Sequence, residues 1–363
     1  MKTLFITSAA DAAGKNMLML GLGSQMQQDK YRVGFFKPIG NKPIRHERIL
    51  TDEDIVFFHQ SLGLNESVNN LCPLVLSDEI TEEVISGKSM PQPVMDLNGK
   101  IAKLMERISQ DKDVMLVKGL GRFYRGAMFG LTESNLIKDF NWKTILVDGY
   151  RAGRLALPID TLDGFITAKK LFGNLLIGVV INNVPDSQLD YLKKKVVPYL
   201  RDRHQIDVLG IIPQTDALRA VSVKELCQAL GGEIICAKDK EDTLVERFCM
   251  STMNVENDLR YFRQEKCKAV VCSGDRTDIH LAALETPTQC LVLTGRLYPA
   301  DIILSKAEEQ GVPVIVVRDD TLKTMGKIDR LSKHLGVFTP SKVNAAIKIV
   351  KQHVNIKAIY KRI

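Results

Sequence analysis

The 363-residue chain lacks the features that mark several large classes of protein. It contains one Trp, only 6% aromatic residues and no run of about 18 apolar residues, so we expect no membrane-spanning helix. It also contains no block of five or six basic residues. A formal net charge of +7 is modest and favours a solvated surface over nucleic-acid binding. That balance also suits a small ligand that carries phosphate.

Cysteines at metal-binding or redox spacing are missing as well. The seven cysteines are odd in number, form no C-x-x-C pair and mostly lie in apolar runs, and the six histidines are scattered. We therefore expect buried free thiols in a reducing cytoplasm, with no disulfide framework and no metal cluster. The apolar stretch after Lys2 is too short for a signal peptide, which also favours a cytoplasmic protein.

Apolar β-branched runs alternate with helical patterns along the first 214 residues. This order is typical of an α/β fold, a doubly wound parallel sheet whose strands are buried on both faces. The expected strands are Thr3–Thr7, Val33–Lys37, Val114–Lys118, Thr144–Asp148, Leu176–Asn182 and Val208–Ile212. The expected helices are Asn16–Gln28, Asp52–Ser61, Asn98–Gln110 and Asp186–Asp202.

A second α/β series begins after Pro213. Strands are expected over Ala269–Ser273, Cys290–Thr294 and Val314–Val317, and helices over Val223–Leu230, Leu244–Met250, Ile279–Leu284, Ala300–Gln310 and Ser341 to about Val354. We predict one domain over 1–214, a smaller one over 215–325 and a helical extension over 326–363. No run rich in Pro, Gly or Ser marks the boundary, which rests on the pattern alone.

The stretch Ala9–Asn16 stands between the first apolar strand and the first helix, where a phosphate-binding loop belongs. Gly14 lets the backbone approach a ligand, Lys15 can reach phosphate oxygens, and a helix N-terminus favours anions. Asn16 stands where a Ser or Thr hydroxyl normally meets Mg²⁺. By itself the stretch is either a phosphate loop or an ordinary strand-to-helix turn.

Six motifs in order carry a resemblance over roughly residues 1–215. They read F-I-T-x₆-G-K, V-G-F-F-K-P-I, D-E-D, D-V-x-L-V-x-G, G-V-V-I-N-N-V-P and L-G-I-I-P. This order resembles the dethiobiotin-synthetase-like (BioD-like) P-loop domain, which also forms the amino-terminal part of long bacterial phosphate acetyltransferases. The resemblance implies a P-loop NTPase fold that binds ATP or another nucleotide, and a homodimer, because such domains often pair.

The resemblance also implies three metal-binding positions, of which two are altered. The Asp of the synthetases corresponds to Asp54, the loop Thr to Asn16, and a Glu at a strand end to Lys118. A lysine there would repel Mg²⁺ and could neutralise phosphate directly. We therefore expect Mg²⁺ to be held poorly and phosphoryl transfer to be absent or very slow, because that chemistry needs the metal.

Further positions follow from the same resemblance. Lys15 and Lys37 are the candidate catalytic residues; Lys37 corresponds to a substrate-contacting lysine but reads equally as a solvent-facing residue at a strand end. Asn182 corresponds to the residue that recognises the base, and could also be a turn residue. Arg122, Arg125, Arg151 and Arg154 follow strand ends, where ligands gather in such sheets, although each could belong to a solvated loop.

Residues after 215 resemble the DRTGG domain through the stretch 269–279. Gly274, Asp275, Arg276 and Thr277 are candidate ligand-binding residues, and Asp278 replaces the Gly of the family motif. We expect Asp278 to cap the following helix. Arg276 could bind phosphate or form a structural ion pair.

The two resemblances together match a family described as phosphotransacetylase-like. The chain reaches only Ile363, where the acetyltransferase domain would follow, so acetyl transfer is not expected. We predict a regulatory or accessory protein that binds a nucleotide or anionic metabolite and is linked to acetyl-phosphate metabolism. The alternatives are an active ATP-dependent ligase or slow ATPase, and a structural protein with empty clefts.

Overall fold

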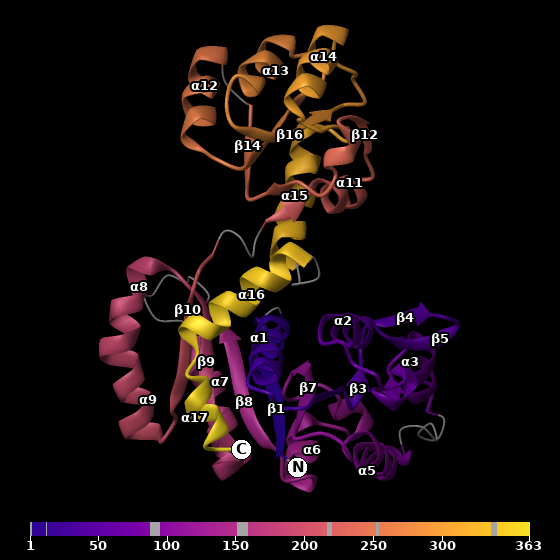
Figure 1. Cartoon of the computed structure of the whole chain (residues 1–363), viewed down its shortest axis with the longest axis vertical. Coiled ribbons are helices and arrows are strands. Elements are labelled where there is room, and N and C mark those ends of the chain that lie inside the picture. Colours follow the sequence, from indigo (N-terminus) through magenta and orange to yellow (C-terminus); the bar gives the residue numbers. More distant parts are fainter. Residues whose placement is uncertain are drawn as a thin grey trace. The chain divides into compact units, whose positions relative to one another are not determined.

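The computed structural model describes residues 2–11, 13–87, 95–150, 159–215, 220–251, 254–334 and 340–363. The chain forms two compact units, labelled by element in Figure 1. The first comprises Met1–Gln214 together with Val337–Ile363, and the second comprises Thr215–Gly336. The expected extension over 326–363 is thus divided between them. No helix among the described residues is both long and apolar enough to cross a membrane.

The first unit is built on a parallel sheet with the strand order β10-β9-β8-β1-β7-β2, which confirms the doubly wound α/β fold. Its strands are β1 (Lys2–Ser8), β2 (Val33–Phe36), β7 (Val114–Arg122), β8 (Lys143–Gly149), β9 (Leu176–Val184) and β10 (Val208–Pro213). From β1 the chain goes first to β2 on one side and later to β8 on the other. Ligands bind at such a reversal, beside the carboxyl ends of the strands.

Helices follow most of these strands. They are α1 (Lys15–Gln28), α2 (Glu53–Ser61), α3 (Asp78–Ile85), α5 (Leu97–Ile108), α6 (Glu133–Asp139), α7 (Ile159–Phe172), α8 (Asp186–Tyr191) and α9 (Val197–His204), with a π-helical turn at Leu192–Val196 between the last two. Short 3₁₀ turns occur at Val68–Asn70, Ala127–Phe129 and Gly173–Leu175. The expected helix Asp186–Asp202 is therefore one helical stretch interrupted by a π turn.

A small β-substructure between β2 and α2 was not expected from the sequence. A hairpin of β4 (Pro43–His46) and β5 (Ile49–Asp52) delivers the chain to α2, and β3 (Ile39–Gly40) pairs with β6 (Leu74–Val75). The hairpin ends on Asp52, whose side chain accepts a hydrogen bond from the Asp54 N–H and caps α2. It therefore positions both carboxylates.

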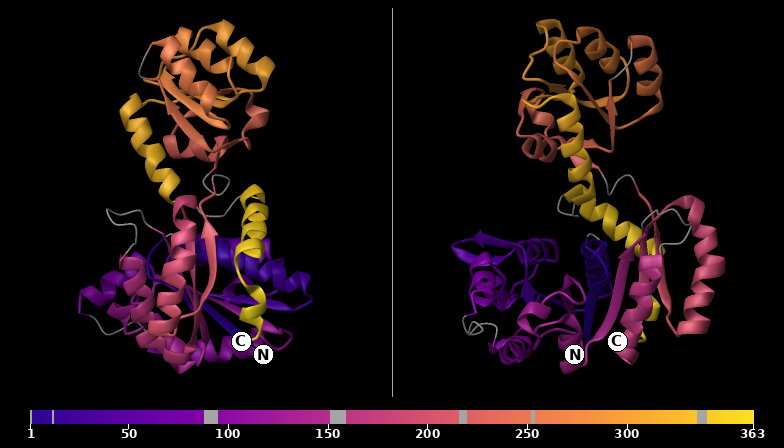
Figure 2. Two further views of the ribbon diagram at one scale, coloured as in Figure 1. Left: turned by 90° about the vertical axis from the view of Figure 1, so that its left-hand side faces the viewer. Right: turned by 180° about the vertical axis from the view of Figure 1, so that it is seen from behind.

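The carboxyl-terminal helices α16 (Pro340–His353) and α17 (Ile356–Tyr360) belong to the first unit and are drawn in yellow in Figure 2. Helix α16 packs on α1 so closely that a Cβ at Gly21 would lie 2.3 Å from Cβ of Val350. The Asn355 N–H donates to the Leu209 carbonyl over 2.7 Å, which ties this segment to the edge strand β10.

The second unit has a five-stranded sheet with the order β12-β17-β16-β15-β14, in which only β12 is antiparallel to its neighbour. Apolar clusters cover both faces of it. The strands of the second unit are β11 (Val221–Ser222), β12 (Glu233–Cys236), β13 (Leu244–Val245), β14 (Arg247–Met250), β15 (Lys268–Ser273), β16 (Thr288–Thr294) and β17 (Val314–Val316). Its helices are α11 (Val223–Leu230), α12 (Val255–Gln264), α13 (Thr277–Leu284), α14 (Asp301–Gln310) and α15 (Thr321–His334), with a 3₁₀ turn at Lys238–Lys240.

The expectation of a helix over Leu244–Met250 is wrong. This stretch forms β13, which pairs with β11, and the edge strand β14, which pairs with β15. Seven residues with apolar side chains at both helical and strand spacing do not specify a period. Pairing with the neighbouring sheet therefore decides the structure.

Candidate phosphate-binding site

The loop between β1 and α1 lies at the carboxyl edge of the parallel sheet. Gly14 is the N-cap of α1 and has a φ of 103°, a left-handed conformation that favours glycine. The Asn182 Nδ2 donates to the Ala13 carbonyl over 3.1 Å and would lie 2.2 Å from a Cβ at Gly14. Asn182 therefore braces the loop, and its role in base recognition stays a prediction.

The N-terminus of α1 carries an uncompensated partial positive charge. No side chain caps it, and its first turn contains no acidic residue. The backbone N–H groups of the first turn are the orphan donors that bind phosphate in loops of this kind. The loop geometry thus favours an anion.

Lys15 lies beneath this loop with its ammonium group held by neutral acceptors. Its Nζ donates to Ser8 Oγ over 2.7 Å and to the Gly121 carbonyl over 3.4 Å. Burial lowers the pKa of Lys15, although the nearby Glu133 and Asp54 carboxylates oppose this effect. A phosphate oxygen would supply the negative charge that neither of these two acceptors provides.

Next to the loop lies a buried cluster of two lysines and two aspartates. Lys37 Nζ donates to Asp52 Oδ1 and to Asp54 Oδ2, each over 2.7 Å. Lys118 forms a second ion pair with Asp54 Oδ2, and the Asn16 Nδ2 donates to Asp54 Oδ1 over 3.0 Å. All four charged side chains are at most 5% exposed. The expectation of a solvent-facing Lys37 is therefore wrong: the lysine is committed to the carboxylates.

Charge interactions within the cluster shift its pKa values in opposite directions. Burial would raise the pKa of Asp54, but the Lys118 and Lys37 ammonium groups hold it well below its usual range. Burial lowers the pKa of Lys118 to about 7. The Asp54 carboxylate only partly offsets this lowering, and the positive charges of Lys37 and Lys15 add to it. For Lys37, the two aspartates outweigh burial and raise its pKa.

The cluster does not fit Mg²⁺ as its side chains are placed. Both oxygens of Asp54 accept hydrogen bonds from lysine or amide donors, and Lys118 stands where the resemblance has a carboxylate. Two unit charges about 4 Å apart repel by about 4 kcal/mol near a protein surface, and a divalent ion doubles that cost. Among the described residues, no three His, Cys, Asp or Glu side chains form a group that could hold a metal.

Sequence reasoning missed one carboxylate at this site, that of Glu133. Glu133 is the first residue of α6 and is buried. Its carboxylate accepts one hydrogen bond from Thr7 Oγ1 and another from the Gly121 N–H over 3.0 Å. Burial raises its pKa despite these donors and Lys15. Because Glu133 comes from a short helix with no motif around it, only the folded chain brings it to the phosphate loop.

The predicted residues of the second unit lie at the carboxyl end of β15. The Arg276 guanidinium makes two hydrogen bonds to the Asp278 carboxylate, over 3.0 and 2.9 Å. The N-cap of α13 is Arg276 and no side chain caps this helix, so the expected cap by Asp278 is wrong. Gly274 is packed so closely that a Cβ would lie 2.0 Å from the Leu297 carbonyl oxygen. The residue that replaces the motif glycine thus engages the motif arginine.

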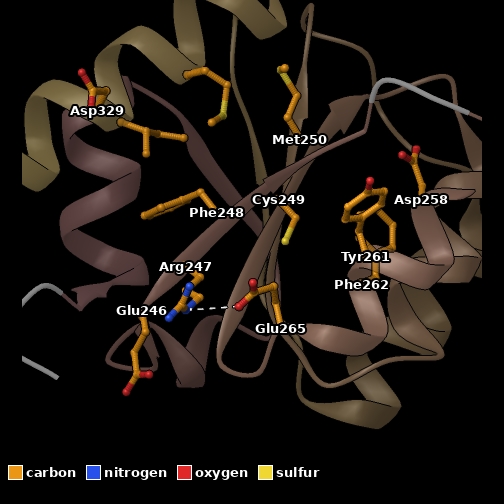
Figure 3. A pocket seen from close by; sticks show the side chains of 12 residues that line it. Glu246, Arg247, Phe248, Cys249, Met250, Asp258, Tyr261, Phe262, Glu265 and Asp329 are labelled. Atoms are coloured by element: carbon orange, nitrogen blue, oxygen red, sulfur yellow. Dashed lines mark ion pairs between the residues drawn. The ribbon is translucent and has the colours of Figure 1, made fainter. Parts of the chain in front are cut away.

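A cavity of about 530 Å³ in the second unit has the wrong charge for phosphate. Figure 3 shows it between β14, α12 and α15. Its lining residues are Glu246, Arg247, Phe248, Cys249, Met250, Asp258, Tyr261, Phe262, Glu265, Met325, Ile328 and Asp329. Four of these are carboxylates, and the single cation, Arg247, pairs with Glu265 over 3.1 Å. An anionic ligand is therefore better served by the first unit.

The structure brings most of the predicted site residues of the first unit together at one end of its sheet. Asn16, Lys37, Asp54 and Lys118 are linked directly by hydrogen bonds, whereas Gly14, Lys15 and Asn182 belong to the adjoining loop. Gly274, Asp275, Arg276 and Thr277 lie in the other unit. Arg151 and Arg154 lie outside the described residues.

Comparison with known families divides the chain in the same order. Residues 2–222 match the AAA domain family, and residues 225–331 match the DRTGG domain family. The phosphate acetyltransferase of Pseudomonas aeruginosa is 24% identical over an alignment that covers 100% of this chain and 52% of that protein. That of Synechocystis is 19% identical and is covered to 50%. The chain spans about half the length of these curated relatives.

Three further proteins match a part of the chain. The ATP-dependent dethiobiotin synthetase BioD of Caldicellulosiruptor saccharolyticus is 23% identical over 51% of this chain and 76% of that enzyme. Among solved structures, MinD of Aquifex aeolicus is 17% identical over 60% of this chain and 84% of that one, with a TM-score of 0.36. The CBS and DRTGG domains of Clostridium perfringens pyrophosphatase are 20% identical over 34% and 49%, with a TM-score of 0.28. Both TM-scores are too low to support any argument about function.

Proposed function

The chain belongs to the AAA domain family and carries a DRTGG domain, and from this premise we propose that it binds a nucleotide or a related anionic metabolite and acts as a regulatory or accessory protein. Its phosphate loop would bind without catalysing phosphoryl transfer. The observation that carries this proposal is the pairing of Lys118 and Lys37 with Asp54, the carboxylate that would otherwise be available to a metal.

Binding would rest on the loop and its lysines. Phosphate oxygens would accept from the backbone N–H groups at the start of α1 and from the Lys15 ammonium, which now donates to a hydroxyl and a carbonyl. Lys118 would stay paired with Asp54 and keep that carboxylate from a metal ion. Asn182 adjoins Gly14 and would meet the base. Phosphoryl transfer, by contrast, depends on a metal that bridges and neutralises the phosphate oxygens.

The regulatory role is proposed from the relatives. The chain aligns with about half of several phosphate acetyltransferases, which favours a role in acetyl-phosphate metabolism. Residues 274–277 form the second candidate site, in which Arg276 would have to leave Asp278 to bind a ligand. We propose a cytoplasmic protein, and a homodimer formed through the P-loop unit.

Isothermal titration of the full chain with ATP, ADP, GTP and AMP tests this function. We expect at least one of them to bind below millimolar concentration, with equal affinity in EDTA and in Mg²⁺. Lys15→Ala removes a charged hydrogen bond worth roughly 1.5–3 kcal/mol and should weaken binding about 10- to 100-fold. Lys194→Ala, at an exposed lysine paired with Asp190, is the matched control and should bind normally. Absence of binding at millimolar nucleotide would refute the proposal.

The alternative function, an ATP-dependent ligase or slow ATPase, is favoured by one observation. Glu133 places a carboxylate beside the phosphate loop, although it comes from α6 and not from the strand end that the resemblance implies. Release of phosphate from ATP in Mg²⁺ would support this alternative if it disappears in both Lys15→Ala and Glu133→Gln. Release that persists in Lys15→Ala would point to a contaminating enzyme.

A further inference from the structure

Two arginines form ion pairs with Asp11, the single acidic residue of the phosphate loop. Asp11 lies in the loop, and its carboxylate pairs with Arg122 Nε over 3.3 Å and with Arg125 Nη2 over 3.2 Å. Arg122 is the last residue of β7, and Arg125 lies in the turn that follows. Each of the three side chains is between 38% and 49% exposed. The Asp11 carboxylate thus forms ion pairs with two guanidinium groups beside the proposed phosphate-binding loop.

One glycine, Gly121, adjoins both this group and the half-buried Lys15. The Gly121 carbonyl lies 3.4 Å from Lys15 Nζ, while a Cβ at Gly121 would lie 3.1 Å from both Asp11 Oδ1 and Arg125 Nη1. Gly121 has a φ of 148°, and the absence of a side chain lets Asp11 and Arg125 approach each other. Gly121 thus adjoins both Lys15 and the pair of Asp11 with Arg125, and Arg122 is the next residue of β7.

The ion pairs at Asp11 are of the kind that a phosphate group can replace. Exposed pairs contribute little because water and salt screen them and because both side chains must be ordered. Phosphate offers more negative charge and more acceptor oxygens than a carboxylate, and Arg binds it in a fork geometry. A phosphate group that replaced Asp11 would also lie near Lys15, and the positive charge of Lys15 would help to compensate the negative charge of the phosphate.

We propose that Asp11 is a built-in competitor for the anion site, and that Arg122 and Arg125 pass from Asp11 to the phosphates when a ligand binds. This inference rests on the proposed function and adds a ligand class to it. Once Asp11 withdraws, the two arginines add two positive charges to that of Lys15, which Glu133 partly offsets, while Lys37 and Lys118 stay balanced by Asp52 and Asp54. Two linked phosphates carry about three negative charges at pH 7, so the site selects a diphosphate over a monophosphate.

Titration of the full chain with inorganic pyrophosphate and with inorganic phosphate, both in EDTA, tests this inference. Pyrophosphate should bind at least tenfold more tightly than phosphate. Asp11→Asn keeps the shape of the side chain, removes the competing charge and should tighten pyrophosphate binding several-fold. Arg125→Gln and Arg122→Gln should each weaken it several-fold. Asp113→Asn breaks a comparable exposed pair with Arg32 at the amino end of the strands and should change nothing.

The opposite signs expected for Asp11→Asn and Arg125→Gln make the result decisive. If pyrophosphate binds and Lys15→Ala abolishes binding, but Asp11→Asn weakens it or leaves it unchanged, the competitor role is refuted while the proposed function stands. If neither the wild type nor Asp11→Asn binds nucleotide or pyrophosphate, both proposals fall. Thermal unfolding of each variant, measured without ligand, should match the wild type because these pairs are exposed.

Discussion

The pH dependence of stability should reveal the burial of Lys118. Its pKa is lowered from 10.5 in the unfolded chain to about 7 in the folded one, chiefly by burial. Between these values the unfolded chain binds a proton that the folded chain has released, so the free energy of unfolding rises with pH across this window. The cost of holding the charged ammonium group is fully present below pH 7 and is relieved as the pH rises towards 10.5.

Lys118→Met removes this titration and conserves most of the side-chain volume. Each pH unit inside the window is worth about 1.4 kcal/mol, so the wild type should gain on the order of 2–3 kcal/mol relative to the variant between pH 7 and pH 9. Subtracting the free energy of unfolding of Lys118→Met from that of the wild type removes the contribution of the titrating groups that both proteins share. Lys37 remains paired with Asp52 and Asp54 in both, and Asp54 stays ionised throughout.

Urea unfolding followed by tryptophan fluorescence measures the effect in the unit that contains Lys118. The single Trp, Trp142, is buried in the first unit and stacks on Phe5 of β1, so it reports this unit and is silent for the other. A difference between wild type and Lys118→Met that stays flat or falls from pH 7 to pH 9 would show that the lysine is not held as the structure has it. Lys112→Met, at a lysine of the same unit whose pKa is raised by Glu66 and Asp111, should show no such gain.

Three further predictions concern contacts within the first unit. Gly21→Ala should lower the free energy of unfolding by about 1–3 kcal/mol through overpacking against Val350, as read from urea unfolding, and a variant as stable as the wild type would contradict the close packing of α1 on α16. The pKa of Glu133 is raised in the folded chain, so the folded chain keeps a proton that the unfolded chain loses as the pH rises above about 4.5. The free energy of unfolding of the wild type, relative to that of Glu133→Gln, should therefore fall as the pH rises above this value. A rise would contradict the assignment. Asn182→Ala removes the hydrogen bond to the Ala13 carbonyl and should weaken nucleotide binding about 3- to 10-fold in titration, whereas unchanged affinity would show that the loop needs no brace.

Most of the fold could be predicted because it depends on local patterns. All six main strands of the first unit contain apolar runs that read directly as a parallel sheet, and the loop before α1 carries its own signal in Gly14 and Lys15. The hairpin β4–β5 and the strand β14 were missed or misassigned. These short stretches have no distinctive period, so pairing decides their structure: β4 and β5 pair with each other, and β14 pairs with β15.

The candidate site was only partly predictable for a similar reason. The sequence placed Lys118 where a metal-binding carboxylate belongs, and the charge reversal alone predicted a poor metal site. It did not predict that Lys37 would be buried against Asp52 and Asp54, or that Glu133 would reach the loop from α6. These partners lie 12 to 126 residues from the groups they contact, at separations where no periodicity operates.

By itself the sequence determined the α/β class, the succession of a P-loop unit and a DRTGG unit, and the identity of the altered loop positions, because strand periodicity, helix starts and short motifs depend on neighbouring residues. Only the tertiary structure decided how the charges are paired. Asp54 is held by two lysines, Asp11 by two arginines, and α1 is covered by a helix more than 300 residues away in the chain. Such pairings depend on which strand ends meet at one edge of a folded sheet, and that is a property of the whole chain.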